Sequence, residues 1–264
     1  MDHLRRELAP ISNLGWEQIA EEATRVLKQR LAARRLVDFH DHHDWTLSAV
    51  PTGRISEQSA GEVQLARREV TPLMEMRADF VLSRDELDAA DRGAPDMDTG
   101  PVIAAAVAAA RAEDLLVFTG DSVAGVVGIA EASPHPTVDL GSGVIEAVAE
   151  AVEVLRLASV AGPYALAVGA DLWVGLQAGS DRGYPLMSHL KLLLDGPVVW
   201  APSLTGALLI SQRGGDFEIE AGQDWAIGYQ GHDDQSVALY LQSSATVVVS
   251  TPEASVRIGG SVKS

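Results

Sequence analysis

Three histidines and three aspartates stand within seven positions of the stretch VDFHDHHDWT, residues 37–46. Imidazole and carboxylate are ligands that zinc, iron and manganese prefer, so this spacing could hold a metal ion. The closest enzymatic pattern is the H-x-H-x-D-H motif of binuclear metallo-hydrolases, and His40, His42 and Asp44 match its first three positions. Trp45 stands where that motif requires a further histidine. A metal-dependent hydrolase is therefore one hypothesis, and a polar turn without a native metal, which we favour, is the other.

No other catalytic motif is visible in the sequence. Leu140–Gly143 precedes an expected helix as a dinucleotide-binding fingerprint would, but Glu146 occupies the third glycine position of that fingerprint. A phosphate-binding loop of the GxxxxGK[ST] type and a G-x-S-x-G nucleophile elbow are both missing, and the chain has no cysteine. We therefore expect a protein that is not an enzyme and needs no cofactor.

The composition limits the possible partners. The 264 residues are 47% apolar and carry a net charge of −17, which predicts a globular fold with a substantial core. So acidic a chain is unsuited to binding nucleic acid or an anionic membrane surface. Neither a signal peptide nor an apolar run long enough to span a bilayer is visible, since the longest run is 102–110. We expect a cytoplasmic protein.

Periodicity predicts a mixture of helices and strands. Apolar residues at helical spacing predict helices at 13–35, 83–93, 101–114, 143–160, 171–178 and 184–194. Strand patterns appear at 73–80 and 164–168 and in several segments after residue 196. The polar, turn-rich stretch 45–69 reads as an extended loop or β-hairpin arm. Since helices and strands do not alternate regularly, the expected class is α+β.

Several segments, taken in order, resemble encapsulins, the linocin-type shell proteins of bacterial nanocompartments. The resemblance runs nearly from end to end of the chain. The segments that carry it are LRRELAPIS at 4–12, RRLVDF at 34–39, SRDELDAADRG at 83–93, GPYALAV at 162–168, GYPLMSHLKLLLDGPVVWAP at 183–202, RGGDFEIEAGQDWAIGY at 213–229 and TPEASV at 251–256.

The resemblance implies a Hong Kong 97-type phage capsid fold with three parts. The peripheral domain would comprise residues 1–48, which include the first helix, residues 72–135, and the returning strands 225–264. Residues 49–71 would be the extended loop, and residues 136–224 the axial domain. Apolar residues of this loop would pair with neighbouring subunits of an icosahedral homo-oligomer of about 60 chains.

The resemblance also implies two functional surfaces. A groove on the inner wall would bind the C-terminal targeting peptide of a cargo enzyme. The positions that match this groove are Leu27, Leu31, Arg34, Asp38, Trp225 and Ile227. The loop Ala178, Gly179, Ser180, Asp181, Arg182 and Gly183 would line a five-fold pore.

The implied function is to enclose an enzyme, with a dye-decolorising peroxidase as the first choice of cargo and a ferritin-like protein as the second. Oxidative stress or iron storage would then be the physiological setting. A phage-derived head protein filled with DNA would share the fold and is a third hypothesis. Flavin, which some encapsulins bind on an exposed aromatic side chain, is not expected, because residues 83–93 contain no aromatic residue.

Overall fold

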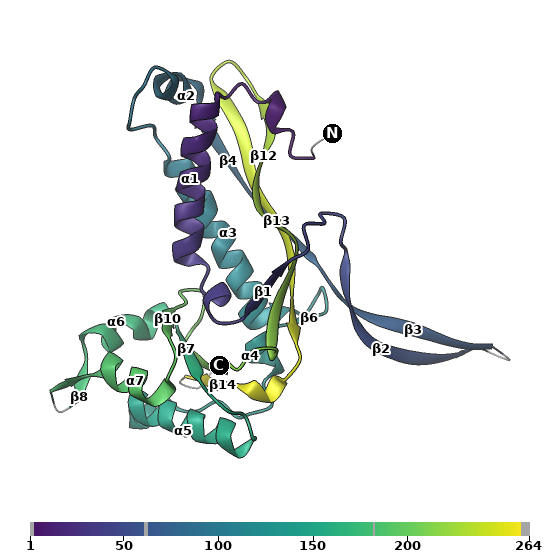
Figure 1. Ribbon diagram of the computed structural model, residues 1–264, viewed down its shortest axis with the longest axis vertical. Coiled ribbons are helices and arrows are strands. Elements are labelled where there is room, and N and C mark those ends of the chain that lie inside the picture. The colour runs from purple at the N-terminus through teal and green to yellow at the C-terminus, as the bar shows by residue number, and fades with distance from the viewer. Residues whose placement is uncertain (1–2, 61–62, 182, 260–264) are drawn as a thin grey trace.

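Two four-stranded sheets organise the chain, and each carries its own layer of helices (Figure 1). The structure is a computed structural model that describes residues 3–60, 63–181 and 183–259. Among the described residues, no helix is both long enough and apolar enough to cross a membrane.

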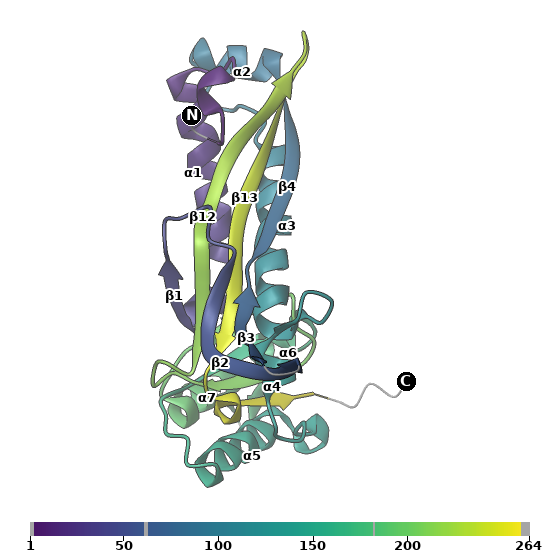
Figure 2. The same cartoon turned by 90° about the vertical axis from the view of Figure 1, so that its right-hand side faces the viewer.

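The first sheet is long and has the strand order β1-β12-β13-β4 (Figure 2). Strand β1 (Asp38–Asp41) runs parallel to β12 (Phe217–His232), whereas β13 (Ser236–Val249) runs antiparallel to both β12 and β4 (Met74–Ser83). Helices α1 (Asn13–Arg30), α2 (Arg84–Asp91) and α3 (Gly100–Thr119) lie against this sheet. Their apolar side chains and those of the sheet form one of the two cores.

Helix α1 is shorter than the expected 13–35. Its N-cap is Ser12, whose hydroxyl accepts a hydrogen bond from the Gly15 amide at 3.1 Å. The helix ends at Arg30 because Leu31 takes a non-helical backbone angle, with ψ at 86°. A separate 3₁₀ helix, η2 (Ala33–Arg35), follows. The prediction of one continuous helix was therefore wrong, and the chain bends between α1 and η2.

Strand β4 confirms the period-two pattern, because its even-numbered residues 74–82 are more buried than the odd-numbered residues between them. Helix α3 is longer than the expected 101–114 and continues to Thr119. The N-cap of α2 is Ser83, whose side chain caps no amide. Gly93, with φ at 97°, closes α2 as expected.

The second sheet has the order β10-β7-β11-β14 and holds the other core. Its strands are β10 (Val198–Trp200), β7 (Tyr164–Val168), β11 (Ala207–Ser211) and β14 (Ser255–Ile258). Helices α5 (Val144–Leu157), α6 (Ala170–Ala178) and α7 (Leu186–Leu194) surround it. The expected strand at 164–168 is confirmed at both ends. Every residue of β7 and β11 is buried, which explains their uninterrupted apolar sequences.

Short elements connect these layers. They are η1 (Arg6–Leu8), β5 (Gly120–Asp121), β6 (Val126–Val127), α4 (Ile129–Ala132), η3 (Leu140–Ser142), β8 (Ser180–Asp181), β9 (Tyr184–Pro185) and η4 (Pro252–Ala254).

The polar stretch after residue 48 forms a β-hairpin, as one of the two expected alternatives. Strands β2 (Ala49–Ala60) and β3 (Val63–Pro72) pair antiparallel, and Figure 1 shows the hairpin extending away from both sheets. We call this hairpin the arm. Four of its large apolar side chains are more than half exposed, namely Ile55, Val63, Leu65 and Val70.

Candidate functional site

The six residues expected to bind a peptide lie near the junction of α1, η2, β1 and β12, and we call them the docking face. Leu27, Leu31 and Ile227 are buried within the core between α1, α3 and the first sheet. Trp225 is half-buried and packs against the same core. The three aliphatic side chains therefore support the face from below, and Trp225 forms part of its surface.

Arg34 lies in η2 and is tied to two acidic side chains. Its Nε donates to Oε1 of Glu113 at 2.6 Å, and its Nη2 donates to Oε2 of Glu113 at 2.8 Å. The same Nη2 also donates to Oδ1 of Asp224 at 2.6 Å. Glu113 belongs to α3 and has no solvent exposure, whereas the Arg34 side chain keeps 16% of its exposure. The guanidinium charge of Arg34 is thus already paired within the protein.

Trp225 completes this set, which we call the Arg34 network (Arg34, Glu113, Asp224 and Trp225). Its indole Nε1 donates to Oε2 of Glu113 at 2.7 Å, and its backbone N–H donates to Oδ1 of Asp224 at 2.6 Å. The register of β12 against β13 shifts between Gln223 and Ala226. An irregularity of this kind redirects side chains out of the normal alternation. It therefore allows the Asp224 side chain to reach Arg34 and the Trp225 side chain to reach Glu113.

The aromatic ring of Phe39 lies under the guanidinium of Arg34, with 4.0 Å between the guanidinium carbon and the ring centroid. Burial disfavours the charged form of Arg34. The hydrogen bonds and charges of Glu113 and Asp224 outweigh that effect, so the pKa of Arg34 is raised. Arg34 therefore stays cationic over any pH at which the protein is folded.

Asp114, next to Glu113 on α3, holds the bend between α1 and η2. Its two carboxylate oxygens accept hydrogen bonds from the amides of Ala32 and Ala33, at 3.2 and 2.9 Å. The side chain is buried, and this burial raises its pKa to about 7 despite the two amide hydrogen bonds. The last turns of α3 thus supply consecutive acids that fix the bend and Arg34.

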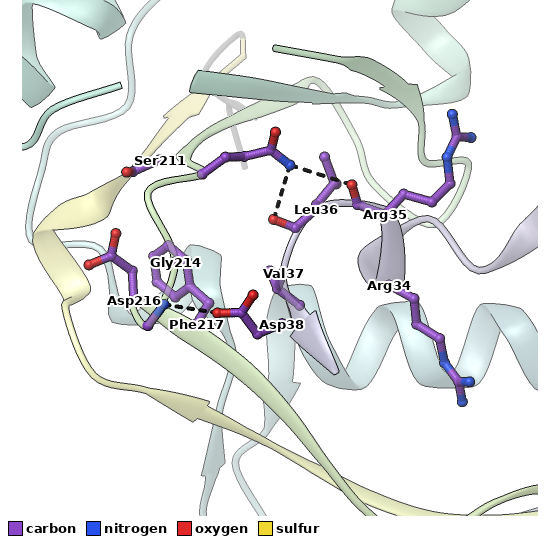
Figure 3. Close-up of a pocket in the computed structure, with 11 residues that line it drawn as sticks. Arg34, Arg35, Leu36, Val37, Asp38, Ser211, Gly214, Asp216 and Phe217 are labelled. Carbon is purple, nitrogen blue, oxygen red and sulfur yellow. Dashed lines mark hydrogen bonds between the residues drawn. The ribbon is translucent and has the colours of Figure 1, made fainter. Parts of the chain in front are cut away.

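Asp38 starts β1 and lines a pocket of about 250 Å³ between η2, β1 and the turn after β11. Its Oδ2 accepts a hydrogen bond from the Gly215 amide at 2.8 Å. In Figure 3, Asp38 points toward this turn, whereas the guanidinium ends of Arg34 and Arg35 point away from each other. Arg34 falls within the helix expected at 13–35, and Asp38 lies just after it. In the structure they lie on η2 and β1, because α1 ends at Arg30.

Glu113, Asp224 and Phe39 were missed as members of the site. Glu113 and Asp114 end the expected helix 101–114 and stand between the apolar stretches 102–110 and 115–118, and two acids in such a position are a signal of internal partners. Asp224 and Phe39 carry no comparable signal, because their roles depend on the β12 irregularity and on β1.

The His/Asp-rich stretch does not assemble into a metal centre. His40 and Asp41 belong to β1, His42 contacts Glu220 through Nε2, and His43 pairs with Asp41 at 2.9 Å. Asp44 accepts hydrogen bonds from the backbone and side chain of Thr46. Among the described residues, no group of three His, Cys, Asp or Glu side chains could hold a metal ion. This arrangement gives no support to the hydrolase hypothesis.

The loop expected at a pore forms a small hairpin between α6 and α7. Ala178 ends α6, Ser180 and Asp181 form β8, and Gly183 has φ at 83°. Arg182 lies outside the described residues. The described part of this loop is mostly exposed.

Comparison with known proteins places this chain in a family. A family model described as "Encapsulating protein for peroxidase" matches residues 1–246. A type 1 encapsulin shell protein of Rhodospirillum rubrum is 44% identical over 272 residues, covering 98% of this chain and 97% of the relative. A type 1 encapsulin shell protein of Mycobacterium tuberculosis is 40% identical and covers 98% of this chain and 99% of the relative.

Solved structures share the fold at low sequence identity. The virus-like particle of Pyrococcus furiosus aligns with a TM-score of 0.64 at 17% identity, over 91% of this chain and 98% of that protein. The capsid of Myoviridae phage XM1 aligns with a TM-score of 0.58 at 10% identity, over 88% and 92%. These likenesses concern the arrangement of the elements alone.

Proposed function

This chain belongs to the encapsulin family of shell proteins and has the Hong Kong 97-type capsid fold, and from this we infer that it forms a multimeric, capsid-like assembly. We propose that this assembly is a closed icosahedral compartment that captures a cargo enzyme through the enzyme's C-terminal targeting peptide. The protein is then a structural component, without a catalytic site or cofactor of its own, and acts in the cytoplasm.

The arm supports the closed shell. It extends from the body of the subunit, so its exposed Val63 and Leu65, at 63% and 52%, have few apolar neighbours within the subunit. A hairpin of this kind gains stability when a second copy covers it. We propose that the arm packs on neighbouring subunits and that about 60 copies close the shell.

The two sheets support the proposed division of the chain. Residues 1–48, 72–135 and 225–264 would form the peripheral domain, residues 49–71 the extended loop, and residues 136–224 the axial domain. Two strands depart from these boundaries. β12 enters the first sheet already at Phe217, and β14 at Ser255–Ile258 pairs within the second sheet.

The docking face supports the capture of a peptide. Trp225 presents an aromatic surface over a well-packed core, and Asp38 places a carboxylate in the pocket between η2 and the turn after β11. Leu27, Leu31 and Ile227 would act by holding Trp225 in place. A segment with aliphatic side chains could pack on such a surface while its polar groups meet Asp38.

The hairpin from Ala178 to Gly183 would line the five-fold pore. Its sequence is short and polar, and its described residues are mostly exposed, which suits a passage for small solutes into a compartment that holds an active enzyme.

The observation that carries the proposal is the match of a peroxidase-encapsulating family over nearly the whole chain. It also favours a dye-decolorising peroxidase as cargo over a ferritin-like protein. The test is to purify the shells from the native organism, identify the co-purifying enzyme by mass spectrometry, and remove that enzyme's C-terminal segment. Loss of the enzyme from otherwise intact shells is expected. Retention of the truncated enzyme would refute capture through the peptide.

A further inference from the structure

Glu113 is a buried carboxylate that joins the side chains of two parts of the docking face. Its Oε2 accepts hydrogen bonds both from Arg34 of η2 and from the indole of Trp225 of β12. It lies on α3 beneath both residues and has no solvent exposure. Because it cannot itself touch a bound peptide, any role in binding must act through Arg34 and Trp225.

The Arg34 network carries more negative than positive charge. One guanidinium faces two carboxylates, those of Glu113 and Asp224. The Asp224 side chain keeps 42% of its exposure, and its Oδ1 accepts the hydrogen bonds from both Arg34 and Trp225. The solvent-facing end of the network is thus a carboxylate, although the network is centred on an arginine.

We propose that Glu113 is the positioning residue of the docking face. It holds Arg34 and Trp225 together and, by pairing the charge of Arg34, makes the face select a cationic over an anionic side chain in the cargo peptide. This inference rests on the proposed capture of a peptide. It differs from the simple expectation that Arg34 would attract a carboxylate of the peptide.

The physical reason is the cost of separating buried charges. A peptide carboxylate could reach the guanidinium of Arg34 only by displacing Glu113 or Asp224, and the displaced carboxylate would lose its partner. A lysine or arginine of the peptide meets the exposed end of Asp224 and breaks no existing pair. Discrimination therefore comes from repulsion of the wrong charge as well as attraction of the right one.

The experiment uses assembled shells and two fluorescent-protein probes. One probe ends in the unaltered C-terminal segment of the co-purifying enzyme, and in the other each Lys and Arg of that segment is changed to Glu. Wild-type shells should load the first probe at least about tenfold better, which corresponds to a difference of about 1.4 kcal/mol. A segment without Lys or Arg would overturn the inference.

Two variants test the role of Glu113 itself. Asp224→Asn, at an exposed position, should reduce the preference for the cationic probe. Glu113→Gln combined with Asp224→Asn leaves the guanidinium of Arg34 without a paired carboxylate in the network, and it should reverse the preference. A merely structural role of Glu113 would lower the loading of both probes and leave their ratio unchanged. Glu131→Gln removes the Glu131–Arg257 pair elsewhere on the chain and is the matched control.

The outcomes distinguish a failure of this charge preference from a failure of peptide capture itself. If wild-type shells load neither probe, peptide capture fails and the inference fails with it. If they load both probes equally, only the inference is overturned. Should the double variant not assemble, the ratio in Asp224→Asn shells decides, and an unchanged ratio there contradicts the proposal.

Discussion

Glu113 accepts hydrogen bonds from Nε and Nη2 of Arg34 at 2.6 and 2.8 Å, and no part of this carboxylate reaches solvent. The pair joins α3 to η2, which contact each other in space although α2 and four strands, β1 to β4, separate them in the sequence. A buried ion pair of this kind adds little to the stability of the fold, but removing one partner leaves the other charge buried without a counter-ion.

Arg34→Met should therefore lower the free energy of unfolding by about 3–5 kcal/mol, because it leaves the Glu113 carboxylate buried without its cation. Arg34→Met combined with Glu113→Gln should be more stable than the single variant. Thermal unfolding of shells at one protein concentration measures both. Arg257→Met, which breaks the exposed pair with Glu131, is the control and should cost less than about 1 kcal/mol. A double variant less stable than the single one would contradict this account.

The stability of the shell should depend on the titration of Asp114. Its pKa is raised from 3.8 to about 7 in the folded protein. Between these two pH values, the folded state therefore keeps a proton that the unfolded state has released. The stabilisation is full below about pH 4 and is lost as the pH rises to about 7. Asp114→Asn should thus flatten the change in thermal midpoint between pH 5 and pH 8. Asp88→Asn, at an exposed site, should not. If the thermal midpoint of Asp114→Asn changed with pH as much as that of the wild type, the buried carboxylate would not be the cause of the pH dependence.

Asp38→Lys should empty the shells without preventing their assembly. Asp38 is exposed and its carboxylate accepts one backbone hydrogen bond, so the change disturbs the pocket and not the core. Reversal of its charge should reduce cargo loading by at least about tenfold. Asp139 makes the same kind of hydrogen bond, to the Gly141 amide at 2.9 Å, and Asp139→Lys is the matched control. Normal loading of Asp38→Lys shells would remove Asp38 from the docking face.

Val63→Ser combined with Leu65→Ser should yield folded subunits that do not assemble. The register of the arm places both side chains on the same face of the hairpin, and both are more than half exposed. The sheets lie elsewhere, so circular dichroism should stay unchanged while size-exclusion chromatography shows small species. Val81→Ser, at 53% exposure on β4, is the control outside the arm. Complete shells from the arm variant would show that these residues make no essential contact.

Changing His40, His42 and His43 together to glutamine should leave the metal content of purified protein unchanged. The three side chains do not converge, since His42 contacts Glu220 and His43 pairs with Asp41. Elemental analysis after dialysis measures bound zinc, iron and manganese. One equivalent of metal per chain, lost in the variant, would revive the hydrolase hypothesis.

Much of the fold follows from local patterns in the sequence. The alternation in β4, the apolar run of β7 and the turn-rich arm are set by neighbouring residues, and the structure has them as expected. The end of α1 is different, because Leu31, Ala32 and Ala33 are all good helix formers. Asp114, distant in the sequence, captures the amides of Ala32 and Ala33, and no local pattern contains that contact.

The site was predictable only in part for the same reason. Resemblance to a family pointed to Arg34 and Trp225, but their common partner Glu113 lies on a different helix. Trp225 reaches it because the register of β12 shifts between Gln223 and Ala226. Such a shift depends on pairing with β13 and leaves no mark in the sequence of β12 alone.

The central claim is that this chain builds a closed, hollow shell. Electron microscopy of the purified protein, together with its mass in solution, tests that claim directly. The account predicts uniform hollow particles of about 1.7 MDa, the mass of about 60 copies of the 27.9 kDa chain. A monomer or small oligomer at the concentrations used for purification would contradict it.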